Sequence, residues 1–270
     1  MATSSTDLIS NTDLISKWTR EFVMASLELG ERISFVLSQV MKELRADTLN
    51  RERYCAVSAG VSRSSWFLMG KEQLQKMWEN ILTYLDEHVD FLKTVYMVSW
   101  GVGYTIFEVM ICEFLKEKFR SSGKDSSKLK IYPIAIDPNM TPSTVHKDTD
   151  FYYTFNDFNY NMEEEKERDE RQIIFLCLFP PLGKHDKGAL GEDIKLLQHG
   201  DICLFLTACD ELSGNPNVTT QLPSSSQKHE LFSFSISSFV VADFRYNVWG
   251  DDWVYPVLDC FLLGPLEKKS

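Results

Sequence analysis

The fold of this chain is decided by one stretch, TVYMVSWGVGYT, at residues 94–105. It begins as a short apolar run rich in β-branched and aromatic residues, which predicts a buried strand, and it breaks at Gly101 and Gly103. Residues 106–116 follow directly and predict a helix. A strand, a glycine turn and a helix begin a mononucleotide-binding βαβ unit, where glycine lets the backbone approach a ligand closely. We therefore expect a nucleoside-type ligand to bind over this turn.

Further strands are predicted on the C-terminal side of this stretch. The next apolar or aromatic runs are residues 130–138, 151–158, 172–179 and 201–206, and two more strand candidates are residues 232–244 and 253–263. Strands alternate with helical segments up to residue 206, which predicts a mostly parallel sheet with helices on both faces. The last two strands are expected to form an antiparallel pair at the end of this sheet. The predicted fold class is therefore α/β.

The N-terminal part of the chain is predicted to be helical. Apolar residues recur at helical spacing from Leu14 to about Leu49, with Asn11 or Thr12 as the N-cap. A second helix is predicted for residues 71–85. We expect residues 1–89 to form a helical extension or cap, and residues 90–270 to form the α/β domain.

Composition narrows the classes of partner. The chain has 28 basic and 39 acidic residues and a net charge of −11, without a domain-sized basic stretch, so we expect a small-molecule or protein substrate rather than bulk duplex nucleic acid. No run of 18 apolar residues predicts a membrane span, and the N-terminus lacks a secretory signal pattern. The six cysteines are scattered without a CxxC pair, which indicates reduced thiols and a cytoplasmic protein. The sequence leaves the oligomeric state open.

Four features in a fixed order resemble a known family. They are the glycine turn, an acid ending the next strand at Asp137, an acid in the third strand region at Asp157, and an apolar strand that ends in Pro180 and Pro181. Over about residues 90–265, this order resembles class I, Rossmann-like, S-adenosylmethionine-dependent methyltransferases. The resemblance implies a divergent member with a Rossmann-like, seven-stranded sheet that ends in an antiparallel hairpin, and S-adenosylmethionine as the cofactor.

The resemblance also implies how the cofactor is held. Ser99, Gly101 and Gly103, with Trp100 among them, would contact the methionine part of the cofactor. Asp137 would accept hydrogen bonds from the ribose hydroxyls. In the same comparison, Asp157 would face the adenine.

The reacting groups are expected next to the fourth strand. By the same resemblance, Phe179, Pro180 and Pro181 would lie beside the sulfonium and the incoming nucleophile, and His185 in the following loop is a possible base. Methyl transfer is an in-line displacement that needs alignment more than acid–base machinery, so a sparse site is compatible with it. No metal ligand is assigned to this site.

The departures from the family pattern keep other functions open. Ser99 replaces the usual acid, and Thr105 stands where a third glycine often occurs. One alternative is therefore a catalytically inactive, methyltransferase-like binding or interaction protein. An NAD-dependent oxidoreductase is another, although Ile106 stands at the last position of its GxGxxG fingerprint.

A metal-dependent oxygenase using Fe(II) and 2-oxoglutarate is a further alternative. His146 and Asp148 have the HxD spacing of a facial triad, His199 or His229 would supply the third ligand, and Arg245 would hold the co-substrate carboxylate. Such proteins are built on an antiparallel β-barrel, whereas strands and helices alternate in this sequence.

Overall fold

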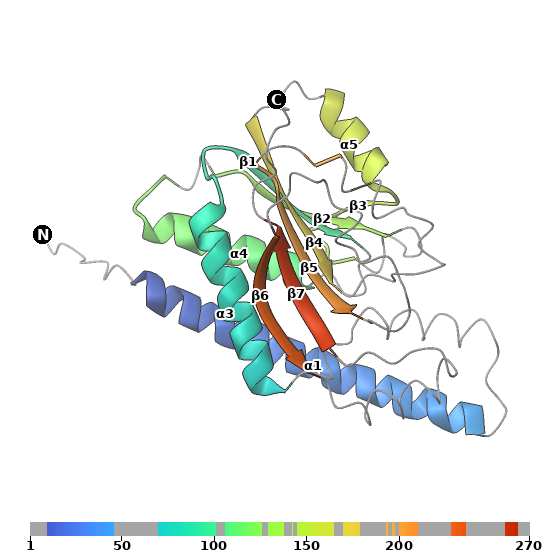
Figure 1. Cartoon of the computed structure of the whole chain (residues 1–270). Helices are drawn as coiled ribbons and strands as arrows, with labels where there is room; N and C mark the ends of the chain where they lie inside the picture. The colour runs from blue at the N-terminus through green and yellow to red at the C-terminus, as the bar shows by residue number, and fades with distance from the viewer. Residues whose placement is uncertain are drawn as a thin grey trace, which may run out of the picture.

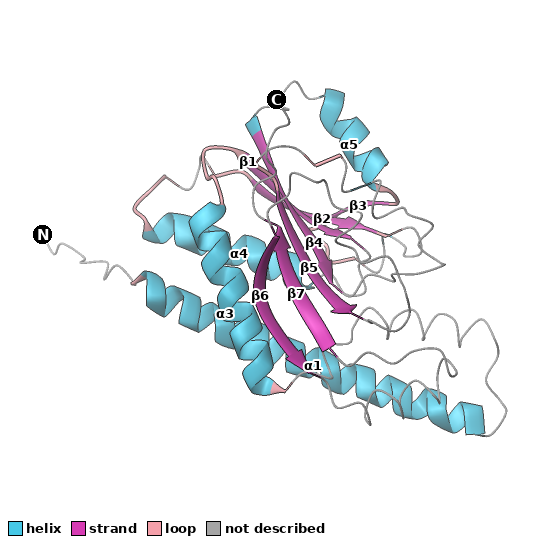
Figure 2. Ribbon diagram, viewed as in Figure 1, coloured by secondary structure: helices cyan, strands magenta, loops and turns pink. Residues whose placement is uncertain are grey.

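The computed structural model describes residues 10–45, 70–100, 106–125, 129–137, 142, 145–164, 170–178, 193, 196–197, 200–209, 228–235 and 257–263. Figures 1 and 2 show a central sheet with helices packed around it. The helices are α1 (Asn11–Arg45), α3 (Lys71–His88), α4 (Ile106–Ser121) and α5 (Phe155–Glu164). The strands are β1 (Thr94–Trp100), β2 (Ile131–Ile136), β3 (Asp150–Tyr152), β4 (Arg171–Leu178), β5 (Ile202–Cys209), β6 (Lys228–Ser235) and β7 (Val257–Leu263).

Five of the strands form a parallel α/β sheet. Their order is β3-β2-β1-β4-β5, and each neighbouring pair is parallel. This arrangement is consistent with a Rossmann-like fold. From β1 the chain first builds β2 and β3 on one side, and it then crosses to β4 on the other side. The strand order therefore reverses between β1 and β4.

The sheet continues beyond β5 with two antiparallel pairings. β7 pairs antiparallel with β5, and β6 pairs antiparallel with β7. The final order is therefore β3-β2-β1-β4-β5-β7-β6. The expected antiparallel pair at this end of the sheet is present in the described residues.

Each face of the sheet contributes to a separate hydrophobic cluster because strand side chains alternate between faces. On one face, Val95 and Met97 of β1 belong to a cluster with residues of α1, α3 and α4. On the other face, Tyr96 and Val98 belong to a cluster with Phe158 and other residues of α5. Both faces of β1 are buried, which explains why its sequence is a continuous apolar run rather than an alternating one.

The N-terminal helices share a core with the sheet. The ring of Trp78 in α3 lies 4.3 Å from that of Phe22 in α1 and 5.1 Å from that of Phe107 in α4, between centroids. The Trp78 indole N–H donates to Ser26 Oγ at 3.0 Å, which satisfies its only polar group. The expected boundary at residues 89–90 falls in the connection between α3 and β1, and the helices before it pack directly against the α/β domain.

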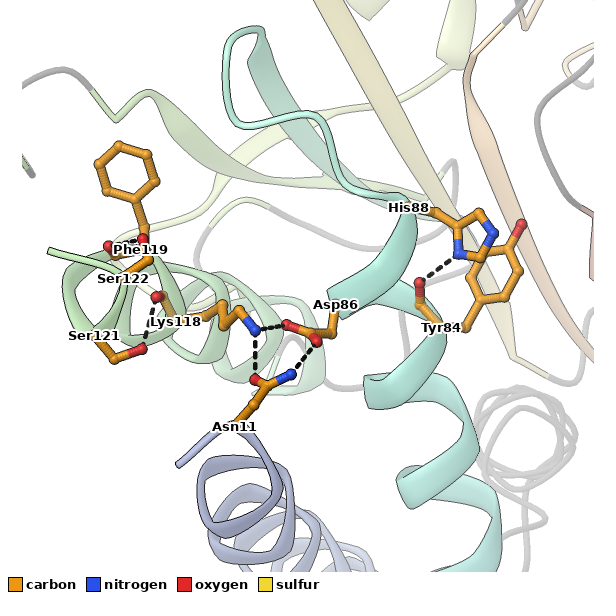
Figure 3. A network of polar contacts seen from close by, with 8 residues as sticks. All are labelled: Asn11, Tyr84, Asp86, His88, Lys118, Phe119, Ser121 and Ser122. Carbon is orange, nitrogen blue, oxygen red and sulfur yellow. Dashed lines mark hydrogen bonds and ion pairs between the residues drawn. The ribbon is translucent and has the colours of Figure 1, made fainter. Parts of the chain in front are cut away.

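A polar cluster joins the beginning of α1, the end of α3 and the last turn of α4 (Figure 3). Lys118 contacts both Asp86 and Asn11, and the Asn11 side-chain amide donates to Asp86 Oδ2 at 2.6 Å. Nearby, the hydroxyls of Ser121 and Ser122 donate to carbonyls of the last turn of α4 at 2.8 and 2.7 Å. The Lys118 carbonyl also accepts the Ser122 backbone N–H at 3.2 Å, so the two hydroxyls add donors to the last carbonyls of the helix.

The sequence predicted most elements correctly. The predicted helices 14–49 and 71–85, the strand and helix that flank the glycines, and the runs at 130–138, 172–179 and 201–206 are confirmed over their described residues as α1, α3, β1, α4, β2, β4 and β5. Residues 46–49, 138 and 179 of these predictions lie outside the described residues. The last two strand candidates are confirmed in part as β6 and β7, and residues 236–244 and 253–256 lie outside the described residues.

Two local predictions are wrong. The N-cap of α1 is Ser10 rather than Asn11 or Thr12, because Ser10 Oγ accepts the Asp13 backbone N–H at 3.2 Å. The aromatic run 151–158 is not one strand, since β3 ends at Tyr152 and α5 begins at Phe155. Phe155 and Phe158 lie three residues apart and both face the core from one side of this helix.

The lengths and apolar character of the helices bear on whether the chain crosses a membrane. No helix in the described ranges combines the length and the apolar character that crossing a membrane requires.

Candidate functional site

The carboxyl ends of the parallel strands meet at one edge of the sheet. In the strand register, Trp100 of β1 is level with Ile136 of β2 and with Cys177 of β4, and Ile136 is level with Tyr152 of β3. In open α/β sheets, ligands bind outside this edge at the point where the strand order reverses. The reversal lies between β1 and β4, so the end of β1 is the centre of the candidate site.

Asp137 follows the last residue of β2 directly and therefore lies beside the end of β1. Its backbone N–H donates to the Tyr152 carbonyl at 3.2 Å, which fixes it between β2 and β3. The residue is fully buried. Its place in the chain agrees with the predicted ribose acid, but a ribose can reach the carboxyl group only if the bound nucleoside displaces the residues that cover it.

Ser99 and Glu108 connect β1 with α4. Ser99 points to the face of the sheet that α4 covers, and its hydroxyl donates to Glu108 Oε2 at 3.3 Å. Glu108 is in the first turn of α4 and is 1% exposed. Its other oxygen, Oε1, is buried without a hydrogen-bond partner in the described structure.

Burial decides the charge of Glu108. It raises the pKa of this carboxyl from an ordinary 4.5 to about 8, against the opposing effect of hydrogen bonds from its own backbone N–H and from Ser99. Glu108 is therefore mainly protonated at neutral pH. A neutral acid at this position avoids the cost of an unpaired buried charge.

Trp100 occupies the opposite face of β1. Its indole N–H donates to Asp193 Oδ2 at 2.7 Å, and both side chains are partly buried. Asp193 belongs to the segment between β4 and β5. The hydrogen bond thus connects the last residue of β1 with the segment that follows β4, the strand next to β1 at the reversal of strand order.

Asp157 has a local role in starting α5. Its carboxylate accepts the Thr154 hydroxyl at 2.8 Å and the Thr154 backbone N–H at 3.1 Å. The Asp157 backbone N–H donates back to Thr154 Oγ1 at 3.1 Å. This reciprocal pair is a capping box, which satisfies two donors at the helix N-terminus.

The structure describes only some of the predicted site residues. Ser99, Trp100 and Asp137 lie together at the carboxyl edge of the sheet, and Asp157 caps the helix that follows β3. The other predicted residues lie outside the described residues, and they are Gly101, Gly103, Phe179, Pro180, Pro181 and His185.

The oxygenase alternative finds little support in the fold. Its expected antiparallel barrel is absent from the described strands, where five parallel strands form the centre of the sheet. His146 Nδ1 lies 3.7 Å from Asp148 Oδ2 at an exposed position. Among the side chains that the structure describes, no group of three or more His, Cys, Asp or Glu residues is arranged to hold a metal ion.

Sequence reasoning missed Glu108 and Asp193. Helical periodicity could have indicated that Glu108 is buried, because Glu108, Cys112 and Leu115 are spaced four and three residues apart and so lie on one side of the helix. All three are buried in the structure. An acid in such a stripe is an unusual residue to bury. Asp193 carried no comparable signal, since its contact with Trp100 joins residues far apart in the chain.

Comparison with known proteins assigns no family. No protein-family model matches this chain, and no curated protein sequence matches it. The class that the structure defines is an α/β domain with a Rossmann-like parallel sheet.

Proposed function

We propose that this protein binds S-adenosylmethionine, or a closely related nucleoside, at the carboxyl end of β1, and acts as a methyltransferase or a derived relative. One observation carries the proposal. β1 passes to α4 through a segment that contains Gly101 and Gly103, at the reversal of strand order and beside the acid that ends β2. This combination of a glycine-containing connection, a helix N-terminus and an acid is suited to a nucleoside.

The end of the sheet gives secondary support. The seven-stranded sheet of the resembling family ends in an antiparallel hairpin, and β6 and β7 pair antiparallel at this end. An ordinary parallel α/β sheet has no need of this feature.

The described residues fit the cofactor in part. Asp137 would supply a carboxylate for the ribose hydroxyls once the residues that cover it are displaced, and the first turn of α4 offers backbone N–H groups without partners inside the helix. S-adenosylmethionine supplies an activated methyl group on its sulfonium. In this proposal, Phe179, Pro180 and Pro181 border the acceptor, and His185 takes its proton where the acceptor has one to lose. The acceptor is a small molecule or a protein.

A second candidate is a methyltransferase-like binding protein without catalysis. Three predicted cofactor contacts already have partners within the chain, since Ser99 bonds to Glu108, Trp100 to Asp193 and Asp157 to Thr154. A ligand must then compete with these contacts, or use backbone groups instead. This observation favours weak binding, or a ligand that differs from the one in active enzymes.

Calorimetric titration with S-adenosylmethionine and S-adenosylhomocysteine tests the proposal. We expect both to bind the wild-type protein, and Asp137→Asn to weaken binding about 10- to 100-fold, because a charged hydrogen bond to ribose contributes about 1.5–3 kcal/mol. Glu113→Ala, at an exposed position on α4, is the matched control and should bind as wild type. Thermal unfolding of each variant verifies that it is folded.

The possible results separate the candidates. No heat with either ligand would refute the cofactor proposal, and unchanged binding by Asp137→Asn would refute the ribose role. Binding without methyl transfer to any offered small-molecule or protein acceptor would favour the inactive binding protein.

A further inference from the structure

The contact between Ser99 and Glu108 lies at the junction on which the proposed site depends. Ser99 is the next-to-last residue of β1, and Glu108 is in the first turn of α4. Their hydrogen bond joins the strand end to the helix start across residues 101–105 of the sequence. No other side-chain hydrogen bond between β1 and α4 occurs among the described contacts.

The hydrogen bond between Ser99 and Glu108 is long, and it satisfies only one of the two carboxyl oxygens. At 3.3 Å it exceeds the usual O–H···O separation of about 2.7–2.8 Å. It leaves Glu108 Oε1 buried without a partner among the described residues, and burying such an atom costs about 1–3 kcal/mol. An apolar residue would serve packing better at this place, as Phe107, Ile111 and Leu115 do on the same helix.

We propose that Glu108 is a positioning residue for the ligand site, which holds the first turn of α4 against the carboxyl end of β1 through Ser99. The inference rests on the proposed function, because it names how that same site is kept in shape. The described side-chain contact of Glu108 is with Ser99, between β1 and α4, so its proposed effect on the ligand is indirect. Glu108 acts on the ligand through the position of the α4 N-terminus, where a helix has backbone N–H groups without intrahelical partners.

The positioning depends on pH, because only the neutral form of Glu108 is compatible with burial. Burial raises the pKa of Glu108 to about 8, so that the carboxyl ionises above this pH. The ionised group gains free energy by reaching water, and this movement draws the first turn of α4 away from β1. Ligand affinity should therefore fall as the pH rises through about 8.

The groups that face Glu108 do not offset this charge. Ser99 from β1 is uncharged, and Cys112, one turn further along α4, has a thiol pKa raised by burial and stays neutral. No charged side chain of the described part of the chain shifts the Glu108 pKa in either direction. A new charge on Glu108 would therefore be unpaired.

The test compares Glu108→Gln with the wild type from pH 7 to pH 9, using S-adenosylhomocysteine as the probe. Glutamine keeps the size and a hydrogen-bond acceptor but never ionises. We expect wild-type affinity to fall about tenfold relative to the variant between pH 7 and pH 9, because the ionised fraction rises from about one tenth to about nine tenths. Taking the ratio at each pH removes the titration of the ligand's own amino group.

Two further variants separate positioning from general stability. Cys112→Ala, on the same buried side of α4, should lower stability but keep the wild-type pH dependence. Ser99→Ala should weaken binding at pH 7 while Glu108→Gln does not, since the latter keeps an acceptor for the Ser99 hydroxyl. Equal pH dependence in the wild type and Glu108→Gln would overturn the proposal.

A ligand-free measurement keeps this test distinct from that of the proposed function. Hydrogen exchange of the Met110 and Ile111 amides reports on the first turns of α4. We expect their protection factors to fall about tenfold between pH 7 and pH 9 in the wild type and to stay constant in Glu108→Gln. If no nucleoside binds at any pH, the proposed function fails, and these protection factors alone decide whether Glu108 positions α4. Identical profiles in the two proteins would refute that role.

Discussion

The two ends of α4 are held in different ways. At its last turn, Lys118, Asp86 and Asn11 each contact the other two, and the three residues come from three helices (Figure 3). At its first turn, Glu108 is buried deeper than any of them, and its carboxyl accepts one long hydrogen bond from another side chain, that of Ser99. The polar side chains at the last turn are thus paired with one another, as a stable fold favours. At the first turn, Glu108 Oε1 has no described hydrogen-bond partner, and this turn lies at the edge where α/β sheets bind ligands.

The largest effect is expected at the first turn of α4. A carboxyl whose pKa rises from 4.5 to about 8 on folding contributes stability that is fully present below pH 4.5 and is lost as the pH rises to about 8. Glu108→Gln removes this loss. Between pH 4.5 and pH 8, the free energy of unfolding of the variant should therefore rise by up to about 4 kcal/mol relative to that of the wild type. Urea unfolding at the two pH values measures the difference. Parallel stability profiles would show that Glu108 does not retain its proton on folding.

A smaller effect is expected at the last turn. Lys118→Met keeps the length of the side chain but leaves the Asp86 carboxylate, which is 8% exposed, without its cation. Removing one partner of a mostly buried pair should lower the free energy of unfolding by about 2–3 kcal/mol in urea titrations.

Glu113→Ala is the matched control for this substitution. It breaks the exposed pair between Glu113 and Lys116 on the same helix and should cost less than about 0.5 kcal/mol. Equal losses in the two variants would mean that the three-helix cluster contributes no more than a surface ion pair. Ligand affinity should be unchanged in both.

The smallest effect is expected at the start of α5, where Asp157 is an exposed counterpart of Glu108 that accepts two hydrogen bonds at Oδ2. Asp157→Ala removes the acceptor for the Thr154 hydroxyl and should cost about 1 kcal/mol, measured by thermal unfolding. The exposed neighbour Asn156 provides the control, as Asn156→Ala should cost less than about 0.5 kcal/mol. A tenfold loss of nucleoside affinity without this loss of stability would assign Asp157 to the ligand instead of the helix cap.

Local signals explain what the sequence predicted well. The passage from β1 to α4 was predictable because its residues are contiguous and a strand, glycines and a helix leave distinct patterns. The end of β2 was predictable for the same reason, even though Pro133 lies inside that strand. β3 pairs with β2 only from Ile134 onward, so at Pro133 the strand is at the edge of the sheet, where proline is tolerated.

Competing local signals explain the errors. The aromatic residues of 151–158 favoured a strand, but Thr154 and Asp157 together form a helix start within that run. Ser10 capped α1 because its hydroxyl is placed three residues before Asp13, and Asn11 was instead used in the contact with Asp86.

The side chains around the candidate site were least predictable, because they depend on contacts between distant segments. The sequence placed Ser99 beside a ligand, and the structure directs its hydroxyl to Glu108. It gave Trp100 a cofactor role, and the structure pairs its indole with Asp193. Which face of β1 each residue occupies was predictable from alternation, but the partner on that face was not.

The three mutually packed rings of Phe22, Trp78 and Phe107 have a consequence for how the chain is made. Trp78 and Phe22 leave the ribosome before Phe107, because α1 and α3 precede α4 in the chain. At about 5–20 residues per second, the face of Trp78 that Phe107 covers waits a few seconds for its partner. During that interval the nascent helices expose an aromatic surface, so we expect chaperone contact with this protein to be concentrated before α4 emerges.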